Sequence, residues 1–175
     1  MTTYQPIHFI PSSRQSQILA TPIISARAVG HTQEGGTNHW CFYLETSPLT
    51  CIQFDCQPSH SVPSTQITGG SKAYLIISEL DRLLPHDAET EFRLDVAPGL
   101  TVAQILDHLT AHGRHKYEFD SNGVGCRCWV TDQINLLYQL GVFTNGFQVD
   151  AAKDGIRKLW PDQTPHPLDQ GAYYP

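Results

Sequence analysis

Five segments with the composition of β-strands precede every strong helix pattern in this chain, and this order limits its fold more than any other feature. The segments are residues 22–30, 38–45, 50–56, 72–78 and 91–96. The second and third lie on either side of Ser47-Pro48, and two short strands separated by such a turn predict a hairpin. Consecutive strands of this kind pair with their neighbours, so we expect an antiparallel sheet.

Helical patterns occur only in the second half of the chain. Residues 101–112 open with Thr101 and Gln104, which together form a capping box. A second helix is expected over residues 126–140, and a third, short helix from Asp150 to the residues before a proline. Strands followed by helices predict an α+β fold, in which an antiparallel half-barrel carries two to three helices on one side.

Size and composition indicate one domain with one core. The chain has 175 residues, of which 40% are hydrophobic, and we expect residues 1–175 to form a single domain that ends in a Pro-rich tail over 161–175. The Ser, Thr, Pro and Gly of residues 57–70 predict a long surface loop. A net charge of −6 argues against a nucleic-acid partner. With no apolar run of ~18 residues and no secretory signal, we expect a cytoplasmic protein without a membrane span.

A cysteine that follows two glycines is the strongest candidate for chemistry. The chain has five cysteines, an odd number that fits free thiols better than a disulfide framework. In the sequence YEFDSNGVGCRCW, Gly123 and Gly125 precede Cys126 at the expected start of a helix. The free N–H groups and the positive end of the helix dipole favour a thiolate there and can hold an oxyanion. Cys126 is therefore the candidate nucleophile, and Cys128 stays open as the reactive thiol if the helix starts later.

Two further side chains complete a candidate catalytic set. A thiolate nucleophile needs a base, and among nine histidines His39 begins a strand directly after a flexible, Gly-rich segment. Alternation along that strand turns His39 away from Trp40, so the imidazole can face a site while its neighbours fill the core. On the next strand either Asp55 or Gln53 can orient the imidazole, and Asp55 is the stronger electrostatic choice.

Five more residues are candidates for contacts with a small-molecule substrate. Trp40, Tyr43 and Trp129 are expected to supply apolar walls. Gly125 allows close approach of a substrate, and Arg127 either binds an anionic group or caps the turn at the surface. This chemistry needs neither a cofactor nor a metal, and the sequence leaves the oligomeric state open.

The order of the catalytic candidates resembles that of circularly permuted papain-like domains, such as the NlpC-type peptidases and the lecithin–retinol acyltransferase group. In the permuted enzymes a strand carries the His, the following strand carries a polar residue, and the Cys begins a helix. The corresponding residues here are His39, Asp55 or Gln53, and Cys126. The resemblance implies a papain-like permuted fold and a cysteine-dependent hydrolase or acyltransferase that acts on an ester, thioester or amide. The stretches GTNHWCFYLE and GVGCRCWV also resemble a family of small, uncharacterised fungal proteins of similar length.

Three other interpretations stay open at this stage. A zinc site made of Cys126, Cys128, His39 and Cys41 has suitable ligand types, but one residue separates the paired cysteines, whereas zinc ribbons and fingers use two or more. The same pocket can instead serve a non-covalent cyclase or isomerase of a small natural product, with His39 and Asp55 as the acid–base pair. A ligand-binding domain without catalysis is the third interpretation.

Overall fold

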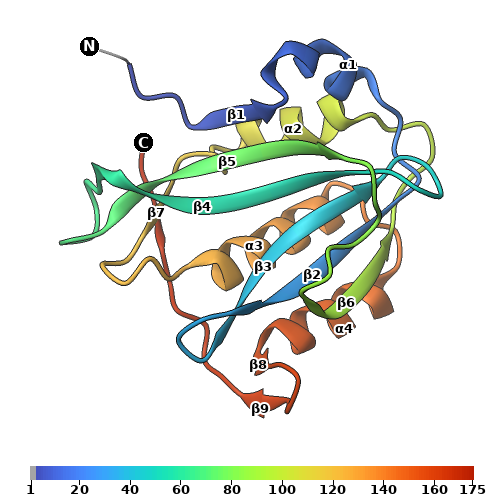
Figure 1. The fold of residues 1–175 in the computed structure, drawn as a ribbon. Coiled ribbons are helices and arrows are strands. Elements are labelled where there is room, and N and C mark those ends of the chain that lie inside the picture. Colours follow the sequence, from blue (N-terminus) through green and yellow to red (C-terminus); the bar gives the residue numbers. More distant parts are fainter. Residues whose placement is uncertain (1–2) are drawn as a thin grey trace.

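A computed structural model describes residues 3–175, which form ten strands and four α-helices (Figure 1). The strands are β1 (Ile7–Ile10), β2 (Ser25–Gln33), β3 (Thr37–Glu45), β4 (Cys51–Pro63), β5 (Ser71–Leu80), β6 (Ala88–Asp95), β7 (Tyr117–Phe119), β8 (Lys158–Leu159), β9 (Thr164–Pro165) and β10 (Ala172–Tyr173). The helices are α1 (Gln15–Ala20), α2 (Val102–Ala111), α3 (Cys126–Gln139) and α4 (Gly146–Ile156), with a 3-10 turn η1 (Ser12–Arg14) before α1. The α+β class expected from the order of the segments is confirmed.

One large sheet organises the molecule. Its strands follow the order β10-β7-β5-β4-β3-β2-β6 with antiparallel pairing, and β1 adds to β5 in parallel. The expected hairpin is confirmed as β3 and β4, in which Phe42 lies opposite Phe54. Among the described residues the outer strands β10 and β6 do not pair with each other, so the sheet stays open. The short strands β8 and β9 form a separate two-stranded sheet.

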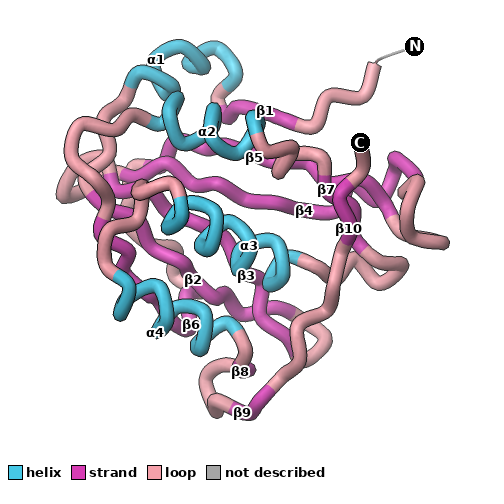
Figure 2. The backbone as a smooth tube through the Cα atoms, turned by 180° about the vertical axis from the view of Figure 1, so that it is seen from behind, coloured by secondary structure: helices cyan, strands magenta, loops and turns pink. Residues whose placement is uncertain are grey.

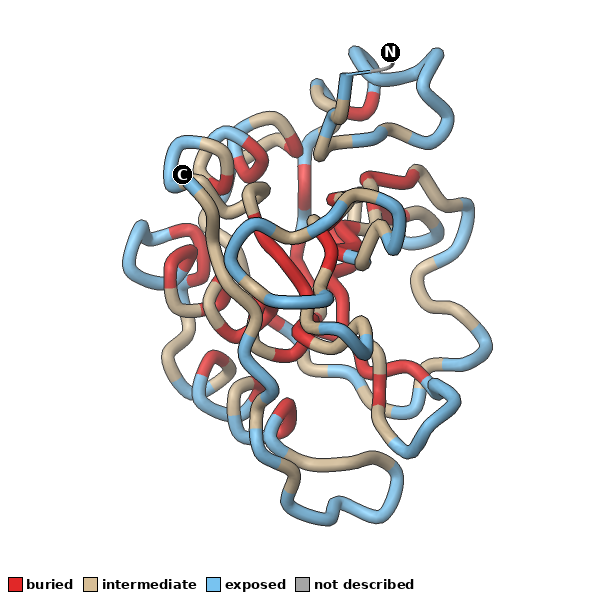
Figure 3. The backbone as a smooth tube through the Cα atoms, turned by 90° about the vertical axis from the view of Figure 1, so that its left-hand side faces the viewer, coloured by how far each residue is buried: buried red, intermediate tan, exposed pale blue. Residues whose placement is uncertain are grey.

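The helices α2, α3 and α4 cover one face of the sheet (Figure 2). Trp40, Phe42 and Leu44 of β3 point into the core that the helices close, as the alternation along this strand predicts. Cys41 and Tyr43, on the opposite side of the same strand, belong to a second and smaller apolar cluster. Buried residues concentrate in the interior, and exposed residues follow the loops at the rim (Figure 3).

The helix ends show which local signals were decisive. The side chain of Gln104 accepts a 2.8 Å hydrogen bond from the backbone N–H of Thr101. This is the bond from the N-cap residue that the predicted capping box of α2 requires. α4 begins at Gly146 rather than near Asp150, because Asn145 caps it and accepts hydrogen bonds from two backbone N–H groups. The sequence pattern gives no signal for α1, which has six residues and an N-cap that makes no side-chain hydrogen bond.

Two segments expected to be irregular carry strands. β4 continues to Pro63, so the surface loop expected over 57–70 is wrong for its first half. Beyond Phe54, β4 no longer pairs with β3, so one edge of β4 has no partner strand. Proline, which has no backbone N–H, is tolerated on such an edge. The Pro-rich tail over 161–175 contains β9 and β10, and β10 pairs with β7. None of the helices in residues 3–175 is long and apolar enough to cross a membrane.

Candidate active site

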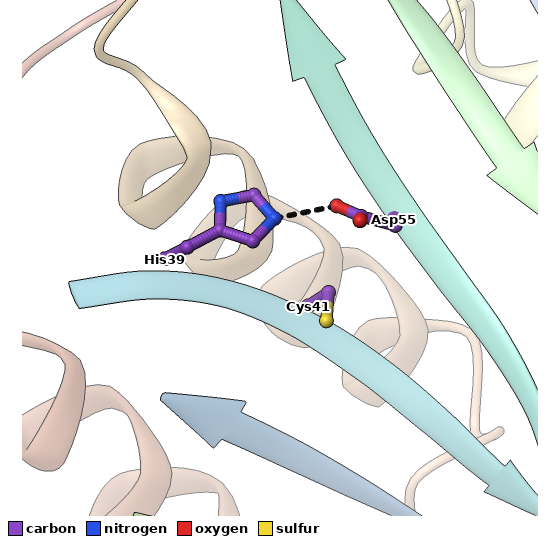
Figure 4. Close-up of side chains that lie close together, drawn as sticks. All are labelled: His39, Cys41 and Asp55. Carbon is purple, nitrogen blue, oxygen red and sulfur yellow. Dashed lines mark hydrogen bonds and ion pairs between the residues drawn. The ribbon is translucent and has the colours of Figure 1, made fainter. Parts of the chain in front are cut away.

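The candidate site lies where β3 and β4 separate. The last residue pair that joins the two strands is Phe42 with Phe54. Beyond this pair β3 stays with β2, where His39 lies opposite His31, while β4 stays with β5. The side chains just past the last pair therefore face an opening in the sheet rather than a neighbouring strand (Figure 4).

His39 and Asp55 meet across this opening. Nε2 of His39 lies 2.6 Å from Oδ1 of Asp55, and Nε2 of Gln57 donates a 2.6 Å hydrogen bond to Oδ2 of the same carboxylate. Asp55 is only 6% exposed, so solvent screens this interaction weakly. The contact leaves the second ring nitrogen, Nδ1, on the side of His39 away from Asp55 (Figure 4).

The surroundings favour the charged forms of both partners. Burial acts to lower the pKa of His39, but the hydrogen bond with Asp55 and the neighbouring Cys126 outweigh burial and raise this pKa well above its usual value. Burial acts to raise the pKa of Asp55, and the hydrogen bonds with His39 and Gln57 lower it overall. The pair is thus stabilised as imidazolium and carboxylate, and Cys126 is near enough to the ring to contribute.

A glycine-containing turn places Cys126 at the first position of α3, as the sequence predicts. Oδ1 of Asp120 accepts two hydrogen bonds of 2.8 Å from backbone N–H groups of this turn. Gly123 and Gly125 have φ angles of 72° and 151°, which a residue with a Cβ rarely adopts. Gly125 is the N-cap and has no side chain that could cap the helix, so the first N–H groups of α3 are free of side-chain capping.

The cleft brings the three catalytic candidates together. Cys126, His39 and Asp55 all line one cleft of about 750 Å³, and Tyr43 lines it as well. Cys126 is 8% exposed, so its thiol reaches the cleft while the rest of the residue packs into the core. The sequence predicts this set from three separate elements, and the separation of β3 from β4 is what lets the start of α3 approach the two strand residues.

The other four thiols lie in surroundings that disfavour the thiolate. Burial raises the pKa of Cys41, Cys56 and Cys128, and raises the pKa of Cys51 to about 11. Cys128 is absent from the lining of the cleft. The choice between Cys126 and Cys128, which the sequence leaves open, therefore favours Cys126. The four-ligand zinc set that includes Cys128 is not assembled.

Trp40 and Trp129 lie in the hydrophobic core, so their assignment as walls of the substrate pocket is wrong. Both side chains are 0% exposed, and neither lines the cleft. Trp40 stacks on Phe92, and Trp129 packs edge-on against Phe42 while its indole N–H donates to the carbonyl of Arg114. The alternation that directs His39 to the cleft necessarily directs Trp40 to the helices.

Arg127 has a structural role that the sequence does not predict. The residue is 2% exposed, and its guanidinium donates hydrogen bonds to the backbone carbonyls of Ile156, His166 and Pro167. It joins the end of α4 to the C-terminal tail, so the interpretation as a cap at the surface is wrong. Arg127 also lines the cleft, and its contact with an anionic substrate group stays a prediction. The carbonyl of Gly125 accepts from the Tyr117 hydroxyl at 2.9 Å, so Gly125 shapes the turn from behind the cleft.

A second polar cluster, which the sequence pattern does not reveal, lies beside the site. Nδ1 of His31 lies 3.1 Å from Oδ1 of Asp87, and its Nε2 lies 3.0 Å from the Tyr43 hydroxyl and 3.2 Å from Sγ of Cys41. Gln53, the alternative to Asp55 in the sequence, donates instead to the Tyr43 hydroxyl at 3.0 Å. These contacts fix Tyr43 in the wall of the cleft and Cys41 in the buried layer behind it.

Two signals in the sequence point to the missed residues. His31 lies opposite His39 because β2 and β3 form a hairpin around residues 34–36, and that register follows once the turn is recognised. Gln57 is two positions after Asp55 and shares its side of β4. Cys41 would be the next register partner of Asp55 after the pair Phe42–Phe54, so the predicted hairpin already brings these two residues near each other.

Comparison with known proteins identifies the family. A family model described as a domain of unknown function, DUF7770, matches residues 23–174, and the chain belongs to this family. The match runs from β2 to β10 and so includes every residue of the candidate site. No curated protein and no solved structure matches the chain.

Proposed function

We propose that this member of the DUF7770 family is a cysteine-dependent hydrolase or acyltransferase that acts on an ester, thioester or amide of a small molecule. The observation that carries the proposal is the position of His39: Asp55 holds it at 2.6 Å on the wall of the cleft that Cys126 also lines. A thiol beside a histidine that is itself oriented by a carboxylate is the arrangement that activates a cysteine nucleophile.

Acylation of Cys126 is the first step. The raised pKa of His39 favours an imidazolium, and this charge together with the start of α3 stabilises the thiolate of Cys126. The thiolate sulfur attacks the substrate carbonyl carbon and forms a C–S bond. Because Nε2 is bound to Asp55, Nδ1 is the nitrogen that gives its proton to the leaving alcohol, thiol or amine.

Deacylation completes the cycle. Water in a hydrolase, or an acceptor in an acyltransferase, attacks the thioester carbonyl while Nδ1 of His39 takes its proton, and the C–S bond breaks to restore the thiolate. The uncapped N–H groups at the start of α3 are suited to hold the oxyanion of each tetrahedral intermediate. Asp55 keeps the ring oriented in both steps.

The order of the site residues supports a permuted papain-like arrangement as part of the proposal. His39 is on β3, Asp55 is on the following strand β4, and Cys126 begins α3, which is the order that the sequence resemblance implies. The chain departs from that pattern through α2, a helix between the second strand and the Cys, and through Gly125 directly before the Cys. Neither departure changes the contacts of the three side chains with the cleft.

Selective alkylation tests the proposal, and Cys128 is the matched control. Cys128 is more exposed than Cys126, so exposure alone predicts faster labelling of Cys128. We expect substoichiometric iodoacetamide near pH 7 to label Cys126 first, with the site identified by peptide mass mapping. Equal, slow labelling of all five thiols, or faster labelling of Cys128, contradicts the proposal. If a substrate is turned over by Cys126→Ala but not by His39→Ala, the acid–base interpretation replaces the nucleophile.

A further inference from the structure

We propose that His39, Cys41 and Asp55 form a binding site for a thiophilic divalent cation such as Zn²⁺, and that a cation bound there switches off the chemistry of Cys126. The metal site depends only on the geometry of these three residues. The switch rests on the proposed function, because the cation uses the residues that we assign as base and orienting group.

The three ligand atoms are already gathered. The ligand atoms of His39, Cys41 and Asp55 all lie within 4.8 Å of one another. His39 and Asp55 point toward one another between β3 and β4, and Cys41 lies beside them on β3 (Figure 4). Ligands at about 2.0–2.3 Å from a tetrahedral zinc are separated by about 3.5 Å. On binding a cation, the His39–Asp55 pair at 2.6 Å therefore has to open and the sulfur of Cys41 has to approach. One imidazole nitrogen, one thiolate and one carboxylate suit Zn²⁺ or Co²⁺ rather than Mg²⁺ or Ca²⁺.

Hydrogen bonds from a second layer of residues hold two of the ligands. Sγ of Cys41 lies 3.2 Å from Nε2 of His31 and accepts from Nε2 of Gln53 at 3.5 Å. Oδ2 of Asp55 accepts from Gln57 at 2.6 Å, which leaves Oδ1 for the cation. Outer partners of this kind orient the ligands in protein metal sites.

The burial of Cys41 and Asp55 and the opening of the site to the cleft also suit a bound cation. Cys41 is 0% exposed and Asp55 is 6% exposed, so two negative ligands in this position need a countercharge. A divalent cation supplies the countercharge and releases the thiol proton to solvent. His39 and Asp55 line the cleft, so the fourth position of the cation opens to water.

The consequence for catalysis follows from the ligand atoms. Nε2 of His39 and Oδ1 of Asp55 are 2.6 Å apart, and a cation between them replaces their hydrogen bond. The imidazole is then held by the metal through Nε2 and loses the hydrogen bond with the carboxylate that orients it. Cys126 is not a ligand in this arrangement. The site thus differs from simple metal poisoning, in which the metal binds the catalytic thiol itself.

Cobalt titration of the reduced protein tests the metal site. Co²⁺ bound through a thiolate gives an ultraviolet charge-transfer band, whereas Co²⁺ held by surface histidines such as His108 and His112 gives none. We expect the band in the wild type, in Cys126→Ala and in the matched control Cys51→Ala, which lacks a different buried thiol. Cys41→Ala is expected to lose the band and to bind at least ~100-fold more weakly, since loss of an outer partner alone costs about 10–100-fold.

Several outcomes overturn the metal site. It is wrong if the wild type shows no band, if the band persists in Cys41→Ala, or if it disappears in Cys126→Ala. Circular dichroism checks that Cys41→Ala is folded. If that variant is unfolded, Asp55→Asn, which keeps the shape of the side chain, replaces it and is expected to weaken Co²⁺ binding similarly.

The switch is tested separately by the rate of iodoacetamide labelling at Cys126. Zn²⁺ is expected to slow this labelling in the wild type and to leave the rate in Cys41→Ala unchanged. Unchanged labelling in zinc-loaded wild type refutes the switch but not the metal site. Loss of selective labelling at Cys126 without any metal refutes the proposed function instead, so the two failures are distinguishable.

Discussion

Replacing Asp55 by Asn is expected to lower the pKa of His39. The Asn side chain keeps the shape and a hydrogen-bond acceptor but removes the charge that lies 2.6 Å from Nε2. A hydrogen bond to a charged group is worth about 1.5–3 kcal/mol, and one pKa unit corresponds to about 1.36 kcal/mol. Burial, which acts to lower the pKa of His39, is no longer opposed by the carboxylate in the variant.

NMR titration of the His39 ring protons measures this shift, with His39→Gln used to assign the resonance. Asp87→Asn is the matched control, because it removes a carboxylate that contacts His31 rather than His39. We expect His39 to titrate as in the wild type in Asp87→Asn and at lower pH in Asp55→Asn. An unchanged pKa in Asp55→Asn, or an equal shift in both variants, refutes the reasoning.

The same pair predicts how the free energy of unfolding depends on pH. The raised pKa of His39 contributes stability that is complete below the unfolded pKa of about 6.5 and is lost as the pH rises through the folded pKa. The lowered pKa of Asp55 contributes stability above about pH 4 that is lost as the pH falls through the folded pKa. Urea unfolding should therefore show the largest difference between wild type and Asp55→Asn between about pH 4 and 6.5. A difference that is constant with pH contradicts the assignment.

Three further substitutions test the structure around the site. Arg127→Met should lower the free energy of unfolding by about 1–3 kcal/mol, because the buried carbonyl of Ile156 loses its donor while the part-buried carbonyls of His166 and Pro167 can bond to water, and urea unfolding measures the loss. Glu118, which holds the loop after β4 by several hydrogen bonds, has a pKa lowered to about 2, so the advantage of wild type over Glu118→Gln in urea unfolding should disappear as the pH falls from ~4.5 through about 2. Gly155→Ala should destabilise by about 1–3 kcal/mol in thermal unfolding, since a Cβ at this position overlaps the ring of Phe92.

Each of these substitutions has an outcome that contradicts it. A loss below about 1 kcal/mol in Arg127→Met means that water replaces the guanidinium at the carbonyls. If the stability difference between wild type and Glu118→Gln does not change below ~pH 4.5, the charge of the Glu118 carboxylate does not stabilise the loop after β4. For Gly155→Ala, the control is to make the same substitution in a Phe92→Ala background, where the ring is absent. If Gly155→Ala costs as much stability there as in the wild type, the overlap with Phe92 is not the cause.

Alternation and turn chemistry account for the parts of the site that the sequence predicts. Side chains on a strand point alternately to its two faces, so this rule alone assigns His39 and Trp40 to opposite sides of β3. The same rule places Trp40 in the core, which is why it cannot also form a wall of the substrate pocket. Gly123 and Gly125 mark a turn that needs left-handed backbone angles, and this signal locates the start of α3.

The missing parts depend on contacts between distant segments. Arg127 resembles a surface cation locally, and its partners His166 and Pro167 come from a tail that lies 39 and 40 residues further along the chain. The opening beside Asp55 requires the separation of β3 from β4, which stay paired with β2 and β5 instead. Such features are set by the packing of the whole sheet, so no local pattern reports them.

The most direct test of the central claim is to trap an acyl group on the protein. The wild type is incubated with a small activated ester such as p-nitrophenyl acetate, and peptide mass spectrometry locates the added acetyl group. We predict one acetyl group on Cys126, formed much more slowly in His39→Ala and absent in Cys126→Ala, while Cys128 stays unmodified. Acetylation spread over several thiols, or an adduct that forms equally fast without His39, contradicts the account.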